Sequence, residues 1–558
     1  MAATPRTKRF HIRKDSDLQV SFLLENGKKH EAPVINVSNR GVAFSVDPDS
    51  ELAASMEQDT LIPNAKFESS KGDQLIGRLL IKFISNDHNL DTFHIGCLSL
   101  DRDMPIETWL GGFLDTTLNE VVNSQKLEID TDIFSIVDFL KGESQDFDIF
   151  SKCARSSTYY QEVKKTDRWC YYIPRSPSKG AHIHLKKERK NKRTDFLVSG
   201  NNDYYGLAAH PEVLAAAKEA IDAYGFGSTG SSITVGHTEE HEKLEEKLAK
   251  NFKTDQAILF NSGYAANLGG ISALLGPNDL VVADILSHSS IVDGMKLAAG
   301  ATRFFRHNDP DFLRKILKRH RNNYAGCLVV VEAVFSMDGD VAPLTEIWKI
   351  AKEYGCRVLI DEAHSYGVLG QSGLGLVEEA GLLGEMDVVM GTFSKTCGGI
   401  GGFLCGSQEV VDWFKIAARS AFFSVSLPPC NVAAVNKALE IIDRDPSLKE
   451  RLVENLKYFA SGLRELGFDL HPEHRTAILP AIVYDDIKIG SMYQYLFSKG
   501  VYTVPAVYPA VAKDQARFRF TATSLHTKSD IDLILFALSN MVEKFGLFEN
   551  NETDQRSA

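Results

Sequence analysis

The sequence has no long hydrophobic run, no closely spaced cysteine pair and no excess of positive charge. Its apolar runs, such as Cys327–Val331, are far too short to cross a bilayer, and its eight cysteines include no CxxC pair. The 62 Lys and Arg residues are outnumbered by 74 Asp and Glu, giving a formal net charge of −12 that disfavours binding to a nucleic-acid polymer. The polar start MAATPRTKRF lacks the apolar region of a secretory signal. We therefore expect a cytoplasmic protein with reduced thiols and no transmembrane segment.

The first hundred residues of this 558-residue chain differ in texture from the rest. Residues 1–104 hold short apolar or alternating segments separated by polar turns, without a helical period, which predicts a small β-barrel or sandwich. The segments are Leu18–Leu24, Ala32–Val37, Val42–Val46, Leu75–Ile84 and Thr92–Leu100. Helical spacing over residues 105–170 predicts a helical linker. The polar tail, residues 546–558, is expected to be disordered.

After about residue 195, helical patterns alternate with short apolar strands. The predicted strands are Ala257–Phe260, Leu280–Ala283, Cys327–Glu332, Arg357–Asp361, Val388–Gly391 and Phe403–Cys405. Such alternation predicts an α/β domain with a mostly parallel sheet and helices on both faces. Ligands of these sheets bind beyond the carboxyl ends of the strands, so the residues that follow each strand are the candidate site.

Several predicted strands end in chemically reactive sequence. These ends read NSGYAAN from Asn261, SHSS from Ser287, DEAH from Asp361 and GTFSK from Gly391. An acid, a lysine, two histidines and a glycine at a helix entrance suit an aldehyde cofactor that carries a phosphate. Pyridoxal phosphate (PLP) requires a lysine for its Schiff base and an acid at its ring nitrogen. Backbone N–H groups at a helix start, with nearby hydroxyls, suit its phosphate.

These strings, in their order along the chain, resemble the α-oxoamine synthases. The matching strings are NDYYGL, YGFGSTGS, HEKLEEKLA, NSGYAAN, EAVFSMDGDVAPL, DEAHSYGVLG, GTFSK, SLPP and ARFRFTATSLHT. That family of fold-type I PLP enzymes includes serine palmitoyltransferase and aminooxononanoate synthase. The resemblance covers about Tyr171 to Phe545. It implies a PLP-binding domain over residues 171–430, a smaller C-terminal α+β domain over 431–545, and a homodimer with shared active sites.

The resemblance assigns five residues to the reacting part of the cofactor. Lys395 corresponds to the Schiff-base lysine, which later removes the Cα proton of the substrate. Asp361 corresponds to the acid that pairs with the pyridinium N–H. His364 and Ser336 resemble the residues that bond the phenolate oxygen, and His364 also approaches the acyl carbonyl. His288 resembles the ring that stacks on the cofactor.

Further residues are implied around the phosphate. The N–H groups of Gly263 and Tyr264 open a helix whose dipole favours negative charge. Thr392 adds a hydroxyl group. Ser424 resembles a residue that reaches the site from the partner subunit.

Two residues are implied on the substrate side. Arg519 resembles the arginine that clamps the amino-acid carboxylate, where its planar fork fits two oxygens. Asn202 is expected to touch the same pocket.

The reaction implied is a decarboxylative Claisen condensation of an L-amino acid with an acyl thioester of coenzyme A or acyl carrier protein, giving an α-amino ketone. GTFSK and GGF favour a serine palmitoyltransferase-like enzyme. The family often has GSR where this chain has Gly230–Ser232, and Thr where it has Ala510, so the amino-acid and acyl preferences stay open. An aminotransferase, which would use the same lysine and acid, is one alternative. A cyclic di-GMP receptor with a non-catalytic PLP-fold platform is another.

One motif has two histidines at the spacing of a metal-binding helix. His237 and His241 have the spacing of a zinc helix, but HTEEH is not HExxH, and it falls where the family has its HxxLE helix. We expect no metal.

The front domain carries an RxxxR, Arg9 to Arg13, and an NxSxxG formed by Asn36, Ser38 and Gly41. Together they resemble PilZ, a six-stranded barrel that binds cyclic di-GMP. Two arginines suit a nucleotide because they fork onto phosphates and stack on guanines. The fusion to an enzyme domain raises the hypothesis that nucleotide regulates activity.

Overall fold

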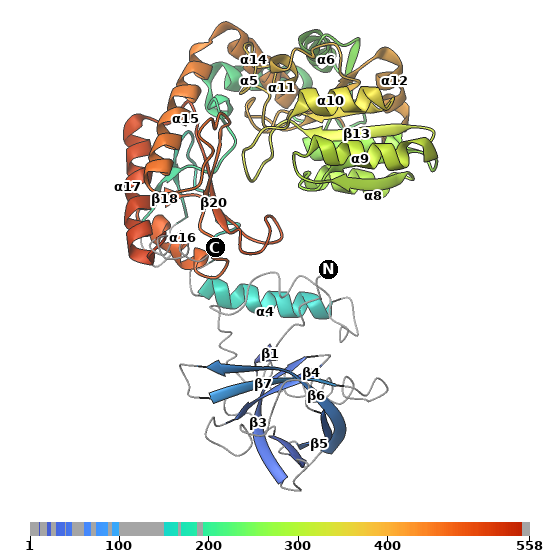
Figure 1. Cartoon of the computed structure of the whole chain (residues 1–558). Helices are drawn as coiled ribbons and strands as arrows, with labels where there is room; N and C mark the ends of the chain where they lie inside the picture. The colour runs from blue at the N-terminus through green and yellow to red at the C-terminus, as the bar shows by residue number, and fades with distance from the viewer. Residues whose placement is uncertain are drawn as a thin grey trace. The chain divides into compact units, whose positions relative to one another are not determined.

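The computed structural model describes seven strands between Phe10 and Ser99, and residues 150–548 apart from 166–168 and 187–192. The chain divides into two compact units, one holding the seven N-terminal strands and the other the later elements (Figure 1). Of the predicted linker, the structure describes helix α4 (Ser151–Lys165), residue 150 and residues 169–170. The remainder of the linker and the tail beyond Phe548 lie outside the described residues.

The strands of the first unit form a closed ring of antiparallel pairs. The pairings run β3-β2-β5-β6-β7-β4 and return from β4 to β3, while β1 adds to β3. The short apolar segments of the sequence therefore do form a small closed sheet. The sequence segments did not include β1 or β5. The strands are β1 (Phe10–His11), β2 (Gln19–Leu23), β3 (Lys29–Ser38), β4 (Gly41–Val46), β5 (Leu61–Glu68), β6 (Gln74–Asp87) and β7 (Thr92–Ser99).

A seven-stranded sheet forms the centre of the second unit. Its order is β10-β16-β15-β14-β13-β11-β12, and only β16 runs antiparallel to its neighbours. The prediction of a mostly parallel sheet is confirmed, and all six predicted strands are present. The unpredicted edge strand, β12, is only partly buried and so lacks a strong apolar run. The strands are β10 (Gln256–Phe260), β11 (Leu280–Asp284), β12 (Ala301–Phe305), β13 (Cys327–Glu332), β14 (Arg357–Asp361), β15 (Val388–Thr392) and β16 (Gly402–Gly406).

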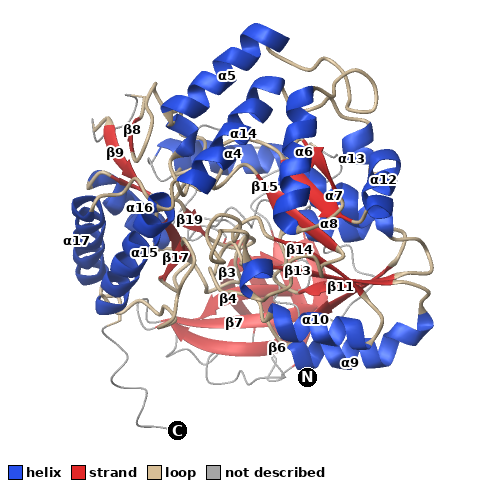
Figure 2. Ribbon diagram, turned by 90° about the horizontal axis from the view of Figure 1, so that it is seen from above, coloured by secondary structure: helices blue, strands red, loops and turns tan. Residues whose placement is uncertain are grey.

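Helices cover both faces of this sheet (Figure 2). Alternate residues of β11 enter two separate buried clusters: Leu280 and Val282 join one, and Val281 and Ala283 the other. Burial on both faces explains why the strands read as continuous apolar runs. One face is covered by α6 (Glu239–Phe252), α9 (Pro310–His320) and α10 (Leu344–Glu353). The other is covered by α7 (Gly263–Leu274), α8 (Ser289–Leu297) and α12 (Gln408–Ala417).

The C-terminal part adds two three-stranded sheets, β17-β20-β19 and β18-β9-β8. Since β9 pairs with β18, the segment before the seven-stranded sheet joins the C-terminal sheet system. The strands are β8 (His182–His184), β9 (Asp195–Val198), β17 (Ile478–Ile482), β18 (Val501–Tyr502), β19 (Pro505–Ala506) and β20 (Arg517–Thr521). The remaining helices are η1 (Leu207–Ala209), α5 (Pro211–Tyr224), η2 (Arg321–Asn323), α11 (Leu376–Glu379), α13 (Arg419–Phe422), α14 (Pro429–Arg444), α15 (Ser447–Glu465), α16 (Ile489–Ser498) and α17 (Lys528–Phe545).

In the part of the chain that the structure describes, no helix has both the length and the apolarity needed to span a membrane.

Strand β16 is fitted closely against the start of α7, so Gly402→Ala should destabilise the protein. A Cβ at Gly402 would lie 2.6 Å from the Cα of Gly263 and 2.7 Å from its nitrogen. Because backbone cannot swing aside as a side chain can, we expect a loss of about 1–3 kcal/mol, measured by urea unfolding. The control is Gly490→Ala in α16, where a Cβ meets nothing within 4 Å. Equal stability of Gly402→Ala and wild type would contradict this packing.

Candidate active site

Lys395 and Asp361 follow neighbouring parallel strands and meet at one edge of the sheet. Strand β14 ends at Asp361, which is in register with Met390 of β15, and Lys395 follows the end of β15 by three residues. Burial lowers the pKa of the Lys395 amine, while the charge of Asp361 acts in the opposite direction. An amine with a lowered pKa is more often neutral and nucleophilic, as Schiff-base formation requires.

The Asp361 carboxylate is fixed by two donors. The amide nitrogen of Asn267 lies 2.7 Å from Oδ2, and the backbone nitrogen of Ala363 lies 2.9 Å from Oδ1. Asn267 also contacts the hydroxyl of Ser290 at 3.0 Å. Sequence reasoning quoted Asn267 within NSGYAAN but gave it no role. The available signal was its spacing, because it lies one helical turn after Gly263 on an Ala- and Gly-rich helix.

His288 caps helix α8 beside this carboxylate. Its Nδ1 accepts from the backbone nitrogen of Ser290 at 3.2 Å and lies 2.8 Å from the Ser290 hydroxyl. Its ring meets the ring of Tyr264 edge to face, with centroids 6.2 Å apart. The pKa of His288 is lowered by burial. The charge of Asp361 opposes this effect, and the charge of Lys395 adds to it. The first two residues of the predicted site, Lys395 and Asp361, thus share an electrostatic environment with His288.

Glu332 is a second buried acid that the sequence analysis missed. It ends β13 directly opposite Asp361 in the parallel register, and its carboxylate accepts the backbone N–H of His288. Burial, followed by the charge of Asp361, raises the pKa of Glu332 well above its usual range. The signal in the sequence was an acid that ends the apolar strand CLVVVE.

His364 is also buried, and the charge of Lys395 acts on it. Its Nδ1 lies 2.8 Å from the hydroxyl of Tyr204. Burial, and then the charges of Lys395, Arg519 and His288, place the pKa of His364 well below its usual value. The imidazole is therefore neutral near pH 7.

The predicted phosphate-binding residues form a cradle. Gly263 begins α7, whose first N–H groups have no partner within the helix. A Cβ at Gly263 would lie 3.0–3.1 Å from atoms of Thr392, so the two residues are in close contact. The Thr392 hydroxyl lies 2.9 Å from that of Ser394. Helix N–H groups with two hydroxyls fit a phosphate group.

The predicted substrate residues also come together. Both terminal nitrogens of Arg519, on β20, lie 3.2 Å from Oδ1 of Asn202. The Arg519 Nε donates to the backbone oxygen of Ser336. Three predicted residues from distant segments therefore meet at one guanidinium group.

Residues 194–538 match the model of the family described as aminotransferase class I and II. This chain belongs to that family.

Its similar relatives are α-oxoamine synthases. It is 38% identical to 8-amino-7-oxononanoate synthase of Thermoanaerobacter pseudethanolicus, over 63% of this chain and 89% of the relative. It is 38% identical to serine palmitoyltransferase of Bacteriovorax stolpii, over 61% of this chain and 80% of the relative. It is 37% identical to 4-hydroxy-2,2'-bipyrrole-5-methanol synthase PigH of a Serratia species, over 69% of this chain, but spans only 59% of PigH.

Solved structures point the same way. Serine palmitoyltransferase of S. paucimobilis with a PLP–myriocin adduct is 32% identical, with a TM-score of 0.68, covering 72% of this chain and 99% of that chain. A serine palmitoyltransferase structure with PLP has the same TM-score and coverage at 33% identity. This member of the class I and II family is thus a PLP-dependent α-oxoamine synthase, and the predicted fold type, family and cofactor are confirmed for this part of the chain. The cradle and the Lys395–Asp361 pair fit PLP.

Other predicted positions lie outside this centre. Ser424 lines a small cavity with Ser232 and Asn261. The ring nitrogens of His241 lie 2.8 Å from the Thr238 hydroxyl and 3.0 Å from the Leu427 oxygen, so this histidine is a helix-capping residue.

The N-terminal candidates are only partly described. Arg9 and Arg13 lie outside the described residues. Asn36 and Ser38 lie on β3, and Gly41 begins β4.

A histidine bridge supports the loop that carries Ser336. His307 lies 3.1 Å from Asp284, at the end of β11, and 2.7 Å from Asp340. Its ring meets that of Phe335 edge to face at 4.5 Å. Burial opposes the charged form, but the hydrogen bonds that the ring donates to Asp284 and then to Asp340 prevail and raise the pKa of His307 to about 10.

Asn267→Ala should weaken PLP retention, because it removes a hydrogen bond to the carboxylate of Asp361. Such bonds contribute about 1.5–3 kcal/mol, so we expect the affinity for PLP to fall at least roughly ten-fold when the apoprotein is titrated with PLP. Asn436→Ala is the matched control, since that amide bonds Glu240. An unchanged PLP affinity in Asn267→Ala would show that Asn267 does not support Asp361.

The stabilising effect of the His307 bridge should depend on pH. A pKa raised from 6.5 to about 10 gives stability that is complete below pH 6.5 and is lost as the pH rises through 10. The stability difference between wild type and His307→Gln should therefore be larger at pH 6.5 than at pH 10, measured by urea unfolding. His320→Gln, at the C-terminal end of α9, is the control. A difference that is constant with pH would mean that His307 is uncharged.

Proposed function

We propose that this chain condenses an L-amino acid with an acyl thioester, with loss of CO₂, to give an α-amino ketone. The observation that carries the proposal is the meeting of Lys395, Asp361, His364 and Arg519 in one site. PLP, when bound, supplies an electron sink for the negative charge at the substrate Cα. The membership in the α-oxoamine synthases supports this reaction class.

Each of these side chains has a separate task. Arg519 binds the amino-acid carboxylate, and Asn202 holds the guanidinium in place until the substrate arrives. Lys395 takes the proton from the Cα. Asp361, held by Asn267, pairs with the ring N–H of the cofactor. His364, neutral and buried, is placed to donate a hydrogen bond to the acyl carbonyl oxygen as negative charge develops there.

The phosphate of PLP is assigned to the cradle at the start of α7. The N–H groups of Gly263 and Tyr264 would be its donors, and the hydroxyl of Thr392, which donates to the Gly401 oxygen in this structure, lies beside them. His288 covers the face of the cofactor ring, and Ser336 bonds its phenolate oxygen.

Serine palmitoyltransferase-like activity is the favoured form of the reaction. Several similar solved structures are serine palmitoyltransferases that match 99% of their own length. Mass spectrometry of products from Gly, Ala and Ser, each with short and long acyl thioesters of coenzyme A or acyl carrier protein, identifies the pair used. The aminotransferase alternative is not favoured, because the relatives reported above are synthases.

A second copy of this chain is the proposed partner. Phe226, Val235 and Phe423 are 83%, 79% and 70% exposed. Their two segments are joined, since the Ser426 backbone nitrogen donates to the Gly230 oxygen at 3.0 Å. A joined apolar surface of this kind suits a homodimer, with Ser424 offered to the neighbouring site. We place the enzyme in the cytoplasm, in keeping with the lack of disulfides among Cys153 to Cys430 in the described chain.

Cyclic di-GMP binding by the first unit is a second proposed function. Strand β1 pairs with β3 so that Phe10 lies opposite Val37 and His11 opposite Asn36. The pairing supports the proposal because the segment with RxxxR runs beside the segment with NxSxxG. Regulation of the condensation by this nucleotide is part of the proposal.

With an acyl thioester and an amino acid as substrates, the purified protein should release thiol from the thioester and CO₂ from the amino acid in equal amounts. Lys395→Ala should lower this rate by about 10²–10⁴-fold or more, because it removes the proton acceptor. Lys415→Ala, on exposed α12, is the control. Formation of a keto acid without thiol release would instead identify an aminotransferase, and a fully inactive wild type would support the platform alternative.

Calorimetry should detect cyclic di-GMP binding that is lost in the double variant Arg9→Ala, Arg13→Ala. Each arginine is expected to donate to phosphate, so the double change removes most of the affinity. Lys315→Ala, in α9 of the other unit, is the control. No heat of binding to the wild type would end the nucleotide proposal, and binding without a change in turnover would end the regulatory part.

A further inference from the structure

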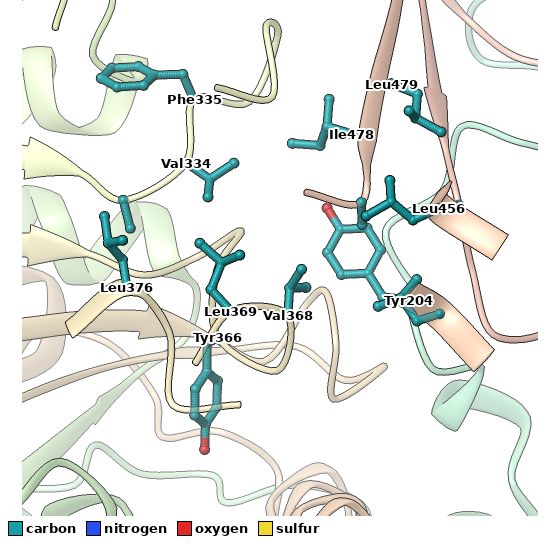
Figure 3. Close-up of a cluster of buried hydrophobic side chains, with 14 of the residues drawn as sticks. Tyr204, Val334, Phe335, Tyr366, Val368, Leu369, Leu376, Leu456, Ile478 and Leu479 are labelled. Atoms are coloured by element: carbon teal, nitrogen blue, oxygen red, sulfur yellow. The ribbon is translucent and has the colours of Figure 1, made fainter. Parts of the chain in front are cut away.

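Tyr204 is a fully buried side chain beside His364. Its exposed fraction is 0%, and it belongs to the buried cluster that includes Val368 and Leu456 (Figure 3). Its hydroxyl lies 2.8 Å from Nδ1 of His364. A hydroxyl buried this deeply is costly unless it is bonded, so this contact is a built feature of the site.

Burial raises the pKa of Tyr204 to about 12, while the charge of Arg519 acts in the opposite direction. The phenol thus keeps its proton at neutral pH and can donate it.

Burial sets the direction of this hydrogen bond. If the phenol only accepted from His364, its own buried proton would lose this acceptor, which is costly. The phenol therefore donates to Nδ1 of His364. A neutral imidazole that accepts at Nδ1 carries its own proton on Nε2.

We propose that Tyr204 is a positioning residue that fixes His364 in its Nε2–H form. This proposal rests on the proposed condensation, in which Nε2–H is the donor that the acyl carbonyl needs.

The tautomer of His364 is measured directly by ¹⁵N NMR. The full-length protein is loaded with PLP and labelled at histidine, and the His364 signals are identified by their loss in His364→Gln. We expect the Nε2–H pattern in the wild type and a mixture of both tautomers in Tyr204→Phe. An Nδ1–H pattern in the wild type, or the same pattern in both proteins, would overturn the proposal.

Kinetics supply the second readout, with a matched neighbour as control. Tyr205 is also buried, but its hydroxyl donates to the backbone oxygen of Gly367. We expect Tyr204→Phe to lower kcat roughly five- to ten-fold, in line with one lost hydrogen bond, with a smaller change in the amino-acid KM. Tyr205→Phe should leave kcat close to that of the wild type. Equal kcat losses in both variants would mean that Tyr204 acts only through packing.

The two proposals fail in different ways. The NMR pattern of the wild type needs no turnover, so an enzyme without condensation activity but with the Nε2–H form would overturn the proposed function alone. An active enzyme whose His364 keeps one tautomer in Tyr204→Phe would overturn the positioning role alone.

Discussion

The placement of the Lys395 amine and the Asp361 carboxylate at one buried edge of the sheet is the constraint on which the rest of the site depends. In a buried setting a charged group is costly unless its surroundings compensate it, so both groups must be held by fixed neighbours. Asn267 and the backbone of Ala363 hold the acid. The parallel pairing of β14 with β15 brings the acid and the lysine to one edge.

The layered fold holds the ends of these strands in place. Two apolar clusters pack against the two faces of the sheet, so the strand ends cannot shift independently. The backbones of helix α7 and strand β16 are in close contact where Gly263 meets Gly402, because neither residue has a side chain. This contact sets the distance of the phosphate cradle from the sheet. The His307 bridge fastens the loop of Ser336 to the end of β11.

Much of this arrangement was predictable from the sequence because its signals are local. Six strands buried on both faces read as apolar runs, and the residues after them carry the chemistry at fixed spacing. Glu332, Asn267 and Tyr204 were missed because their roles exist only across elements. Glu332 acts through the register of β13 with β14, Asn267 through the approach of α7 to a strand end, and Tyr204 through its contact with His364, which lies 160 residues further along the chain. Edge strand β12, half exposed, had no apolar signal to read.

The account is tested most directly by an experimental structure of the protein with PLP bound. It predicts continuous density from the Lys395 Nζ to the cofactor, an Asp361 oxygen at hydrogen-bonding distance from the ring nitrogen, and the phosphate at the first turn of α7. Cofactor bound elsewhere, or Lys395 and Asp361 in separate pockets, would contradict it.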